Sequence, residues 1–248
     1  MRDRMAMIIL ETLEEACREQ GMEMLWEAPV VKFADARDAG FVWLKELVGA
    51  DHYLPRDYLA DAASVLAYFL PFRREIGRGN QGGELASAAW AEAYLVTNRL
   101  FPWVNGARIR ASETLGLSAC QPTDAGMISL EEPSSRWSQR HVAHLAGHVP
   151  FGLNNMLISD RGCMGRYGSI VTKLPVDPDP IPTEERCLYK ARGICGLCAE
   201  RCVVGALRRD GFDRMKCLAQ CMVNDAKYPG ADVCGKCMVE LPCSHMMK

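Results

Sequence analysis

The sequence has 248 residues, 49% of them hydrophobic, which is enough to fill the core of one large domain or two modest ones. Its 29 Lys and Arg against 31 Asp and Glu give a formal charge of -2, so neither nucleic acid nor an anionic membrane is expected as a partner. No stretch reaches the roughly 18 apolar residues of a membrane-spanning helix, and no signal peptide is evident, so a cytoplasmic protein is expected.

The first elements predict a mixed α/β domain. Apolar residues at helical spacing predict a helix over 7–22, with Gly21 as its stop. The segment 31–47 predicts one or two further helices. The run 63–72 is compact, apolar and closed by Pro71, which favours a buried strand.

The next segments continue this domain. Residues 77–83 predict a loop because four of the seven are glycine. A long amphipathic helix is predicted over 84–101, and Pro102 is expected to end it. A separate helix is predicted over 108–115.

The composition changes after residue 174, where four prolines in eight residues predict an extended crossing segment. We place a domain boundary there, between 1–174 and 175–248. Nine of the 12 cysteines lie between Cys187 and Cys243, in a stretch with few large apolar residues. Such a stretch has too little apolar surface to fold as an ordinary core, so another kind of bond must stabilise it.

Two simple explanations of these cysteines fit poorly. A disulfide framework needs an oxidising compartment, for which the sequence gives no sign. Structural zinc is a better alternative, because the two Cys-x-x-Cys pairs at Cys195/Cys198 and Cys234/Cys237 can supply one all-thiolate site. Zinc leaves five neighbouring thiols unexplained.

Iron–sulfur ligation accounts for more of the pattern. A two-cluster ferredoxin run, C-x2-C-x2-C-x3-C, sends its fourth cysteine to the other cluster, and Cys195, Cys198 and Cys202 reproduce its last three positions. Interleaving predicts two 4Fe-4S clusters, one on Cys187, Cys195, Cys198 and Cys243 and one on Cys202, Cys217, Cys234 and Cys237. One thiol is spare, and we expect Cys221, with Cys217 as the alternative.

The segment 137–173 is the densest local signal in the first domain. Its glycines allow a backbone to approach a ligand closely, and Asn154 and Asn155 add amide donors and acceptors; turns between short strands are the alternative. His141, His144 and His148 recur at helical spacing, which fits a proton relay, a metal site or simple helix lining. Cys163 either faces a ligand or is an ordinary buried thiol.

Several pieces of this chain resemble the epoxyqueuosine reductases and, more distantly, the iron–sulfur half of reductive dehalogenases. The matching pieces are FLPF (69–72), WAEAYLVTN (90–98), WSQRHVAHLAGHVPFGLNN (137–155), GSIVT (168–172) and CGKCMVELPC (234–243). The chain is most similar to short members, without C-terminal helical repeats. The resemblance implies an α/β (α+β) fold, with a nitroreductase-like N-terminal domain and a C-terminal two-cluster ferredoxin-like module.

The resemblance also implies a corrinoid, cobalamin, in the first domain. The residues implied to line its pocket are Gly152, Leu153, Asn154, Asn155, Gly168 and Ser169. The family has an acidic proton donor before the Ala-Gly of this segment, and the candidates here are Glu132, which is out of register with the family pattern, and His141.

Two functions follow as expectations. The first is an oxygen-sensitive, anaerobic reductase in which two 4Fe-4S clusters deliver electrons to the corrinoid or to a small-molecule substrate. The second is an electron-transfer or activator protein that carries only the clusters and docks on a redox partner. An electron donor protein of the ferredoxin or flavodoxin type is the expected partner, and a homodimer is possible.

Overall fold

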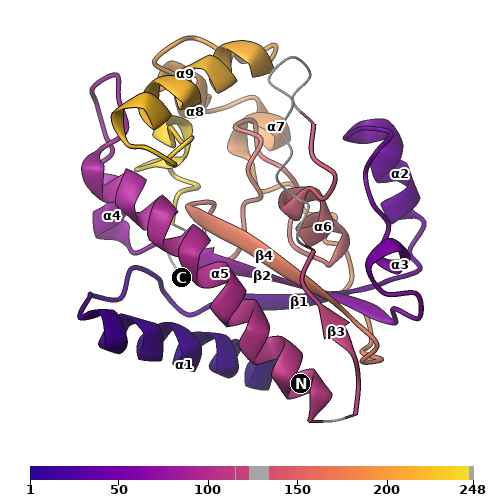
Figure 1. Ribbon diagram of the computed structural model, residues 1–248. Coiled ribbons are helices and arrows are strands. Elements are labelled where there is room, and N and C mark those ends of the chain that lie inside the picture. Colours follow the sequence, from indigo (N-terminus) through magenta and orange to yellow (C-terminus); the bar gives the residue numbers. More distant parts are fainter. Residues whose placement is uncertain (115, 123–133, 246–248) are drawn as a thin grey trace.

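A four-stranded antiparallel sheet forms the centre of the protein. The computed structural model describes residues 1–114, 116–122 and 134–245. The strands are β1 (Val30–Asp35), β2 (Ser64–Pro71), β3 (Ala119–Cys120) and β4 (Gly165–Thr172), in the order β1-β2-β4-β3 (Figure 1). Every neighbouring pair is antiparallel, and the structure is therefore α+β, as expected.

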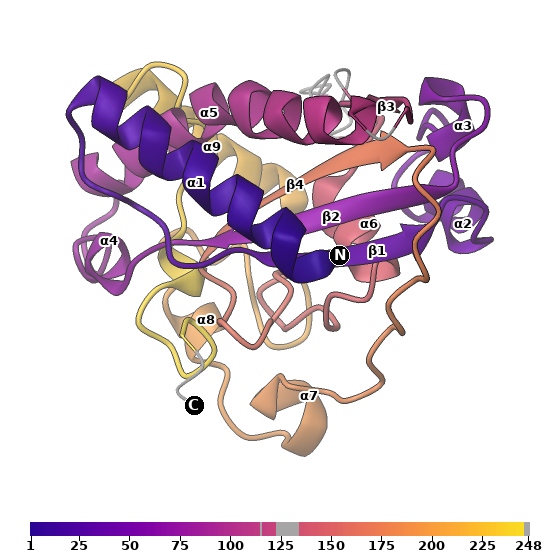
Figure 2. The same cartoon turned by 90° about the horizontal axis from the view of Figure 1, so that it is seen from below.

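Helices cover both faces of this sheet. The long helices α1 (Arg2–Gln20) and α5 (Ala88–Glu113) pack on one face (Figure 2). The opposite face carries α2 (Gly40–Leu47) and α6 (Gln139–Leu145). The remaining helices are α3 (Pro55–Tyr58), α4 (Arg74–Arg78), α7 (Leu188–Arg192), α8 (Leu197–Glu200), α9 (Arg214–Lys227) and the 3-10 helix η1 (Lys236–Met238).

The central strand β2 is buried along its whole length, which explains its continuous apolar sequence. Leu66, Tyr68 and Leu70 point to the side of α1 and α5. Val65 and Phe69 point to the side of α2 and α6, where Trp137 completes the core. The buried strand predicted over 63–72 is thus confirmed, because a strand covered on both faces has no polar alternation.

The N-terminal elements differ from the prediction in one place. Helix α1 ends as expected at Gly21, whose φ of 60° is the left-handed conformation that glycine adopts without strain. The helical prediction over 31–47 is right for α2 and wrong for residues 31–35, which belong to β1. The strand pairs in register with β2, and its Val and Phe side chains favour a strand in agreement with that pairing.

Helix α5 also corrects the prediction, because it runs through Pro102 and absorbs the separate helix expected over 108–115. Proline removes one intrahelical hydrogen bond. Leu100 and Val104, on either side of Pro102, are both buried against the sheet side of the molecule, and this burial offsets the missing bond. The loop predicted over 77–83 begins with the last turn of α4.

The cysteine-rich segment is fastened to the first part of the chain by buried polar contacts. Lys236 is buried and donates to the carbonyl oxygens of Asn80 and Gly82, while the Asn80 amide donates to the carbonyl of Cys234. The Tyr94 hydroxyl donates to Asp232. The domain boundary after residue 174 stays a prediction. Across the described ranges, no helix combines the length and hydropathy needed to cross a membrane.

Candidate functional site

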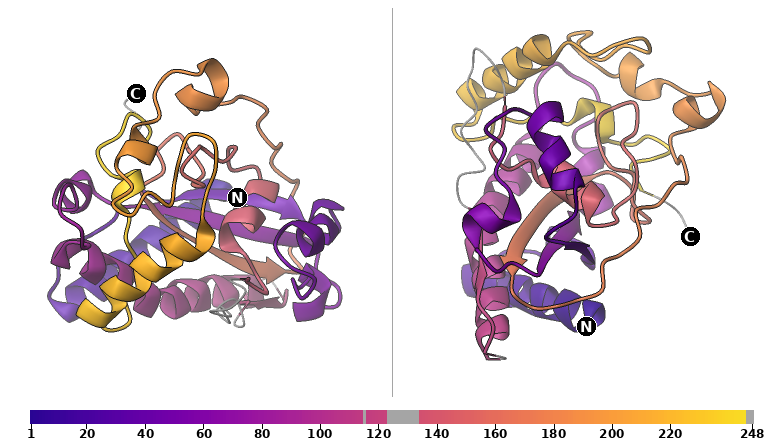
Figure 3. Two further views of the ribbon diagram at one scale, coloured as in Figure 1. Left: turned by 90° about the horizontal axis from the view of Figure 1, so that it is seen from above. Right: turned by 90° about the vertical axis from the view of Figure 1, so that its right-hand side faces the viewer.

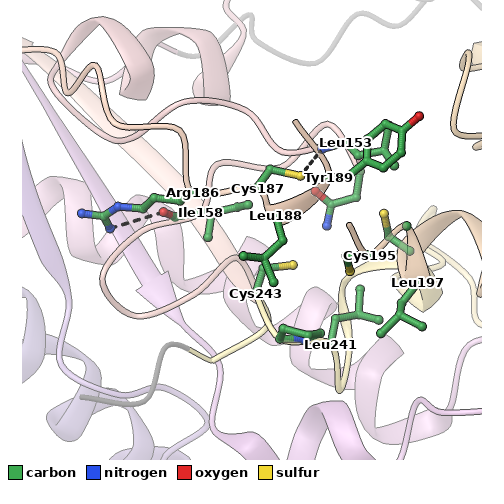
Figure 4. Close-up of a pocket in the computed structure, with 14 residues that line it drawn as sticks. Leu153, Ile158, Arg186, Cys187, Leu188, Tyr189, Cys195, Leu197, Leu241 and Cys243 are labelled. Atoms are coloured by element: carbon green, nitrogen blue, oxygen red, sulfur yellow. Dashed lines mark hydrogen bonds between the residues drawn. The ribbon is translucent and has the colours of Figure 1, made fainter. Parts of the chain in front are cut away.

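Four thiols from separate segments surround one cavity of about 150 Å³. They belong to Cys187, at the start of α7, Cys195, Cys198 in α8, and Cys243 near the C-terminal end. Figure 4 shows Cys187, Cys195 and Cys243 around this space, with Leu241 beside them. We call these four residues the first thiol group.

Local backbone conformation places these thiols. Cys195 has a φ of 87° and lies between Gly193 and Gly196, which are also left-handed. Three such residues in four make a tight reversal that directs the chain from α7 back into α8. The Cys187 N–H donates to the Glu185 carboxylate at 2.8 Å, and the Cys187 sulfur accepts from the Leu153 N–H at 3.4 Å.

The other thiols of the first group are close enough to Cys198 to raise its pKa. Burial, followed by the nearby Cys243, raises the pKa of Cys198 to about 11, and Cys187 and Cys195 contribute in the same direction. Four thiolates in this space would repel one another, so the charged form needs cations among them. The donor set is therefore suited to iron, which thiolate sulfur binds well.

A second thiol group lies next to the first. It consists of Cys202, which follows α8, Cys217 and Cys221 on α9, and Cys234 and Cys237 at η1. Burial raises the pKa of Cys237, and the charges that raise it further are Cys234, Cys217, Cys198 and Cys202. Because Cys198 is a member of the first group, α8 brings the two groups together.

Cys217 and Cys221, both on α9, differ in the pKa of their thiols. They lie one helical turn apart, and their thiols hydrogen-bond to each other. This hydrogen bond lowers the pKa of Cys217 to about 7 and raises that of Cys221. Cys217 is thus the better thiolate, and Cys221 is its hydrogen-bond donor.

All 12 cysteines lie in the described ranges, and each is a free thiol. Among those residues, no group of three or more His, Cys, Asp or Glu side chains is arranged to hold a single metal ion. The first thiol group instead surrounds a space.

The loop 152–155 connects both thiol groups to the sheet domain. The Asn154 amide donates to the carbonyl of Cys237 at 3.0 Å and to the sulfur of Cys163 at 3.6 Å. Leu153 lines the cavity of the first group, and Asn155 has a left-handed φ of 59°. Four of the expected cofactor residues, Gly152, Leu153, Asn154 and Asn155, therefore lie beside the cysteines.

Gly168 and Ser169 are placed differently, inside the sheet. A Cβ at Gly168 would lie 2.4 Å from the ring of Tyr68, so this glycine makes room for a side chain of β2. The Ser169 hydroxyl accepts from the Trp137 indole at 2.9 Å and donates to Gln139 at 2.7 Å. A role of these two residues in binding a cofactor stays a prediction.

The three histidines of this segment lie in different surroundings. His141 and His144 lie on α6, and both rings contact Phe151. Burial and the neighbouring Arg140 lower the pKa of His141 to about 4, so its ring is neutral at pH 7. His148 lies beyond the helix, buried near Tyr167, so the three do not share one helix face. Glu132, the other candidate proton donor, lies outside the described residues.

Two further residues, Arg140 and Cys163, are neighbours of the thiol groups. Arg140 donates to the carbonyl of Asn155 at 2.7 Å and is close enough to Cys237 and Cys217 to interact electrostatically. Cys163 is completely buried and hydrogen-bonds to the thiol of Cys243. The only available signal was their position in or near the glycine-rich segment 137–173.

Comparison with solved structures identifies the fold. A selenomethionine-labelled epoxyqueuosine reductase superposes with a TM-score of 0.57 at 16% identity, covering 95% of this chain and 65% of that one. The enzyme from Streptococcus thermophilus gives 0.56 at 17% identity, again over 95% and 65%. The chain has the fold of the epoxyqueuosine reductases.

A third epoxyqueuosine reductase structure, solved with an epoxyqueuosine-modified tRNA-Tyr stem loop, gives a TM-score of 0.57 at 17% identity over 95% of this chain and 66% of that one. The protein thus spans about two thirds of the length of these epoxyqueuosine reductases. The family resemblance expected from the sequence is confirmed at the level of the fold. No protein-family model and no curated protein matches the chain.

Proposed function

We propose that the protein is an iron–sulfur reductase with two 4Fe-4S clusters, one on each thiol group. The ligands would be Cys187, Cys195, Cys198 and Cys243 in the first group and Cys202, Cys217, Cys234 and Cys237 in the second. The observation that carries the proposal is the first thiol group itself, in which the pair Cys195/Cys198 lines one cavity together with Cys187 and the distant Cys243. When bound, such clusters supply one-electron transfer.

The chain supports thiolates at both groups with backbone donors. The Leu153 N–H donates to the sulfur of Cys187, and the Leu207 N–H donates to the sulfur of Cys202 at 3.3 Å. Hydrogen bonds to cluster sulfurs stabilise the more negative, reduced state. Among the described residues, the small apolar core of this segment consists of Cys198, Leu207 and Leu241, while Met238 and Val239 belong to the main core. With so small a core of its own, the segment would be held together largely by the clusters.

The electron acceptor would bind beside the loop 152–155, between the second thiol group and α6. In the first version of this function the acceptor is a corrinoid, which would supply the hard bond chemistry when bound. His141 is neutral and Arg140 is positive in this region, so the chain offers one proton acceptor and one anchor for an anionic group.

One observation favours the second function, an electron-transfer or activator protein that carries only the clusters. The Ser169 hydroxyl, implied to line the corrinoid pocket, is hydrogen-bonded to Trp137 and Gln139. Part of the implied pocket is therefore filled by the protein's own side chains.

Anaerobic isolation with and without added hydroxocobalamin separates these functions. We expect the reduced protein to give the EPR signals of 4Fe-4S clusters, and Cys198→Ser to lose one of them while Cys120→Ser keeps both. Cobalt that stays with the protein after desalting would establish the reductase with a corrinoid, and its loss with intact clusters would establish the cluster-only protein. Identical spectra for Cys198→Ser and the parent would contradict both.

A further inference from the structure

Apolar side chains are exposed on the surface that covers the first thiol group. Leu188, Ile194, Leu197 and Val203 are 40%, 54%, 41% and 39% exposed. Leu188 and Leu197 also line the thiol cavity, so this surface is continuous with the site (Figure 4). Figures 2 and 3 show α7 at the outer edge of the molecule, on the opposite side of the sheet from α1. We call the segment 186–209 that contains these residues the α7–α8 face.

The α7–α8 face is strongly basic although the chain is slightly acidic. It carries six basic residues and one acidic residue, Glu200, whereas the whole chain has a formal charge of -2. Arg186, Arg208 and Arg209 form ion pairs with carboxylates. The other three, Lys190, Arg192 and Arg201, have no carboxylate partner among the described residues.

The three cations without a carboxylate partner belong to the same segment as the exposed apolar residues. Lys190 donates to the carbonyl of Phe151, and Arg201 donates to the carbonyls of Val239 and Glu240. A carbonyl holds the side chain in place but leaves its charge unneutralised. Positive charges in the same segment as exposed apolar side chains are suited to an acidic partner, because complementary potentials steer encounter and fix orientation.

This face is also where an electron would enter most directly. Cys187 immediately precedes α7, and Cys195 and Cys198 lie on either side of the start of α8. The second thiol group adjoins the first, since Cys198 is one of the charges that act on Cys237. An external donor that contacts the α7–α8 face would therefore reach the first group before the second.

We propose that the α7–α8 face docks an acidic, one-electron carrier protein, with Lys190, Arg192 and Arg201 as charge contacts and Ile194 as an apolar contact. The inference rests on the proposed function. In each encounter the reduced carrier loses one electron and the first cluster gains it, with no bond formed and no proton transferred. Electron-transfer encounters use small, short-lived interfaces, and a patch of this size is suited to one.

The test uses the cluster-loaded protein, with reduced flavodoxin as the acidic carrier. We expect Lys190→Glu/Arg192→Glu to lower the second-order rate constant of cluster reduction at least about 10-fold at low ionic strength. The matched control is Arg4→Glu/Arg18→Glu, which makes the same change in charge on α1, across the sheet. It should stay within about two-fold of the parent.

A binding measurement accompanies the kinetics. Carbodiimide cross-linking should join the flavodoxin to Lys190, and the cross-link should disappear at high salt. Ile194→Ser should weaken binding without changing its salt dependence. Arg192→Glu alone serves if the double variant does not fold.

Several outcomes would overturn the inference. Equal rate constants for the two double variants would show that the α7–α8 face does not dock the carrier. A self-association or a tRNA stem-loop complex that Lys190→Glu/Arg192→Glu abolishes would assign the face to another partner. Reduction by dithionite, which needs no docking, separates this failure from failure of the proposed function. If clusters are present, dithionite should reduce them equally in all variants. If the protein contains no cluster that dithionite can reduce, the proposed function itself is refuted.

Discussion

The thiol of Cys163 is completely buried and hydrogen-bonds to the thiol of Cys243. The bond raises the pKa of Cys163 and lowers that of Cys243, so Cys163 is the neutral donor and Cys243 the better thiolate. A backbone hydrogen bond also joins the two residues, since the Cys163 N–H donates to the Cys243 carbonyl at 2.9 Å. A residue of the sheet domain thereby holds a proposed ligand of the first cluster.

Replacing Cys163 should change the potential of that cluster. Cys163→Ala removes the S–H donor, which stabilises the reduced state more than the oxidised one, so the reduction potential should fall by on the order of tens of millivolts. Cys163→Ser, which keeps a donor, should fall less. Redox titration followed by EPR measures the change, and Cys17→Ala, another buried thiol, is the control. An unchanged potential in Cys163→Ala would remove this role.

Cys217 and Cys221 should behave differently although they lie one turn apart. Because Cys221 donates to Cys217 and lowers its pKa to about 7, Cys217 is the proposed ligand. Cys217→Ala should therefore lose about four iron atoms per chain, whereas Cys221→Ala should keep the full content. Iron analysis of both variants decides, and the reverse pattern would make Cys221 the ligand.

Gly235 should be intolerant of any side chain. Its φ is 74°, and a Cβ would lie 2.3 Å from the Trp90 ring. Gly235→Ala should lower the free energy of unfolding by roughly 2–4 kcal/mol, from backbone strain and overpacking together. Gly21→Ala is the matched control, since its φ is 60° with open space around it, and it should cost only about 1 kcal/mol. Denaturant unfolding measures both, and equal losses would show that Trp90 yields without cost.

Acid should destabilise the protein through His148. Burial lowers its pKa to about 4 from the ordinary value of 6.5, so the folded protein keeps this ring neutral while the unfolded chain protonates it. Stability is therefore unaffected above pH 6.5 and falls as the pH drops towards 4. Between pH 7 and pH 5 the loss from this residue should be about 2 kcal/mol. Urea unfolding of the parent and of His148→Gln measures it, and parallel pH profiles would contradict it.

The sequence predicted those elements whose local signals agree with their packing. Gly21 ends α1, and the uninterrupted apolar run of β2 marks a strand covered on both faces. The helical prediction failed for residues 31–35, where Val31 and Phe33 favour the strand that pairs with β2. The prediction that Pro102 ends a helix was wrong, because the burial of α5 against the core outweighs one lost hydrogen bond.

In the candidate site, too, some residue types were informative in the sequence and others were not. Cysteine spacing reflects how ligands interleave between two groups, and the four thiols assigned to the first group do line one cavity. Their role as cluster ligands stays a prediction. Glycine carries no such information. Gly152 and Gly168 look equivalent in sequence, and a Cβ on either would meet a neighbouring side chain, that of Ile158 or of Tyr68, so both serve packing. Only the fold tells a glycine that admits a neighbouring side chain from one that admits a ligand.

The most direct test of the central claim is the iron and acid-labile sulfide content of anaerobically isolated protein. Two 4Fe-4S clusters predict about eight iron and eight sulfide per chain, and about four of each in Cys198→Ser. Stoichiometric zinc without sulfide, or thiols oxidised in pairs, would contradict it.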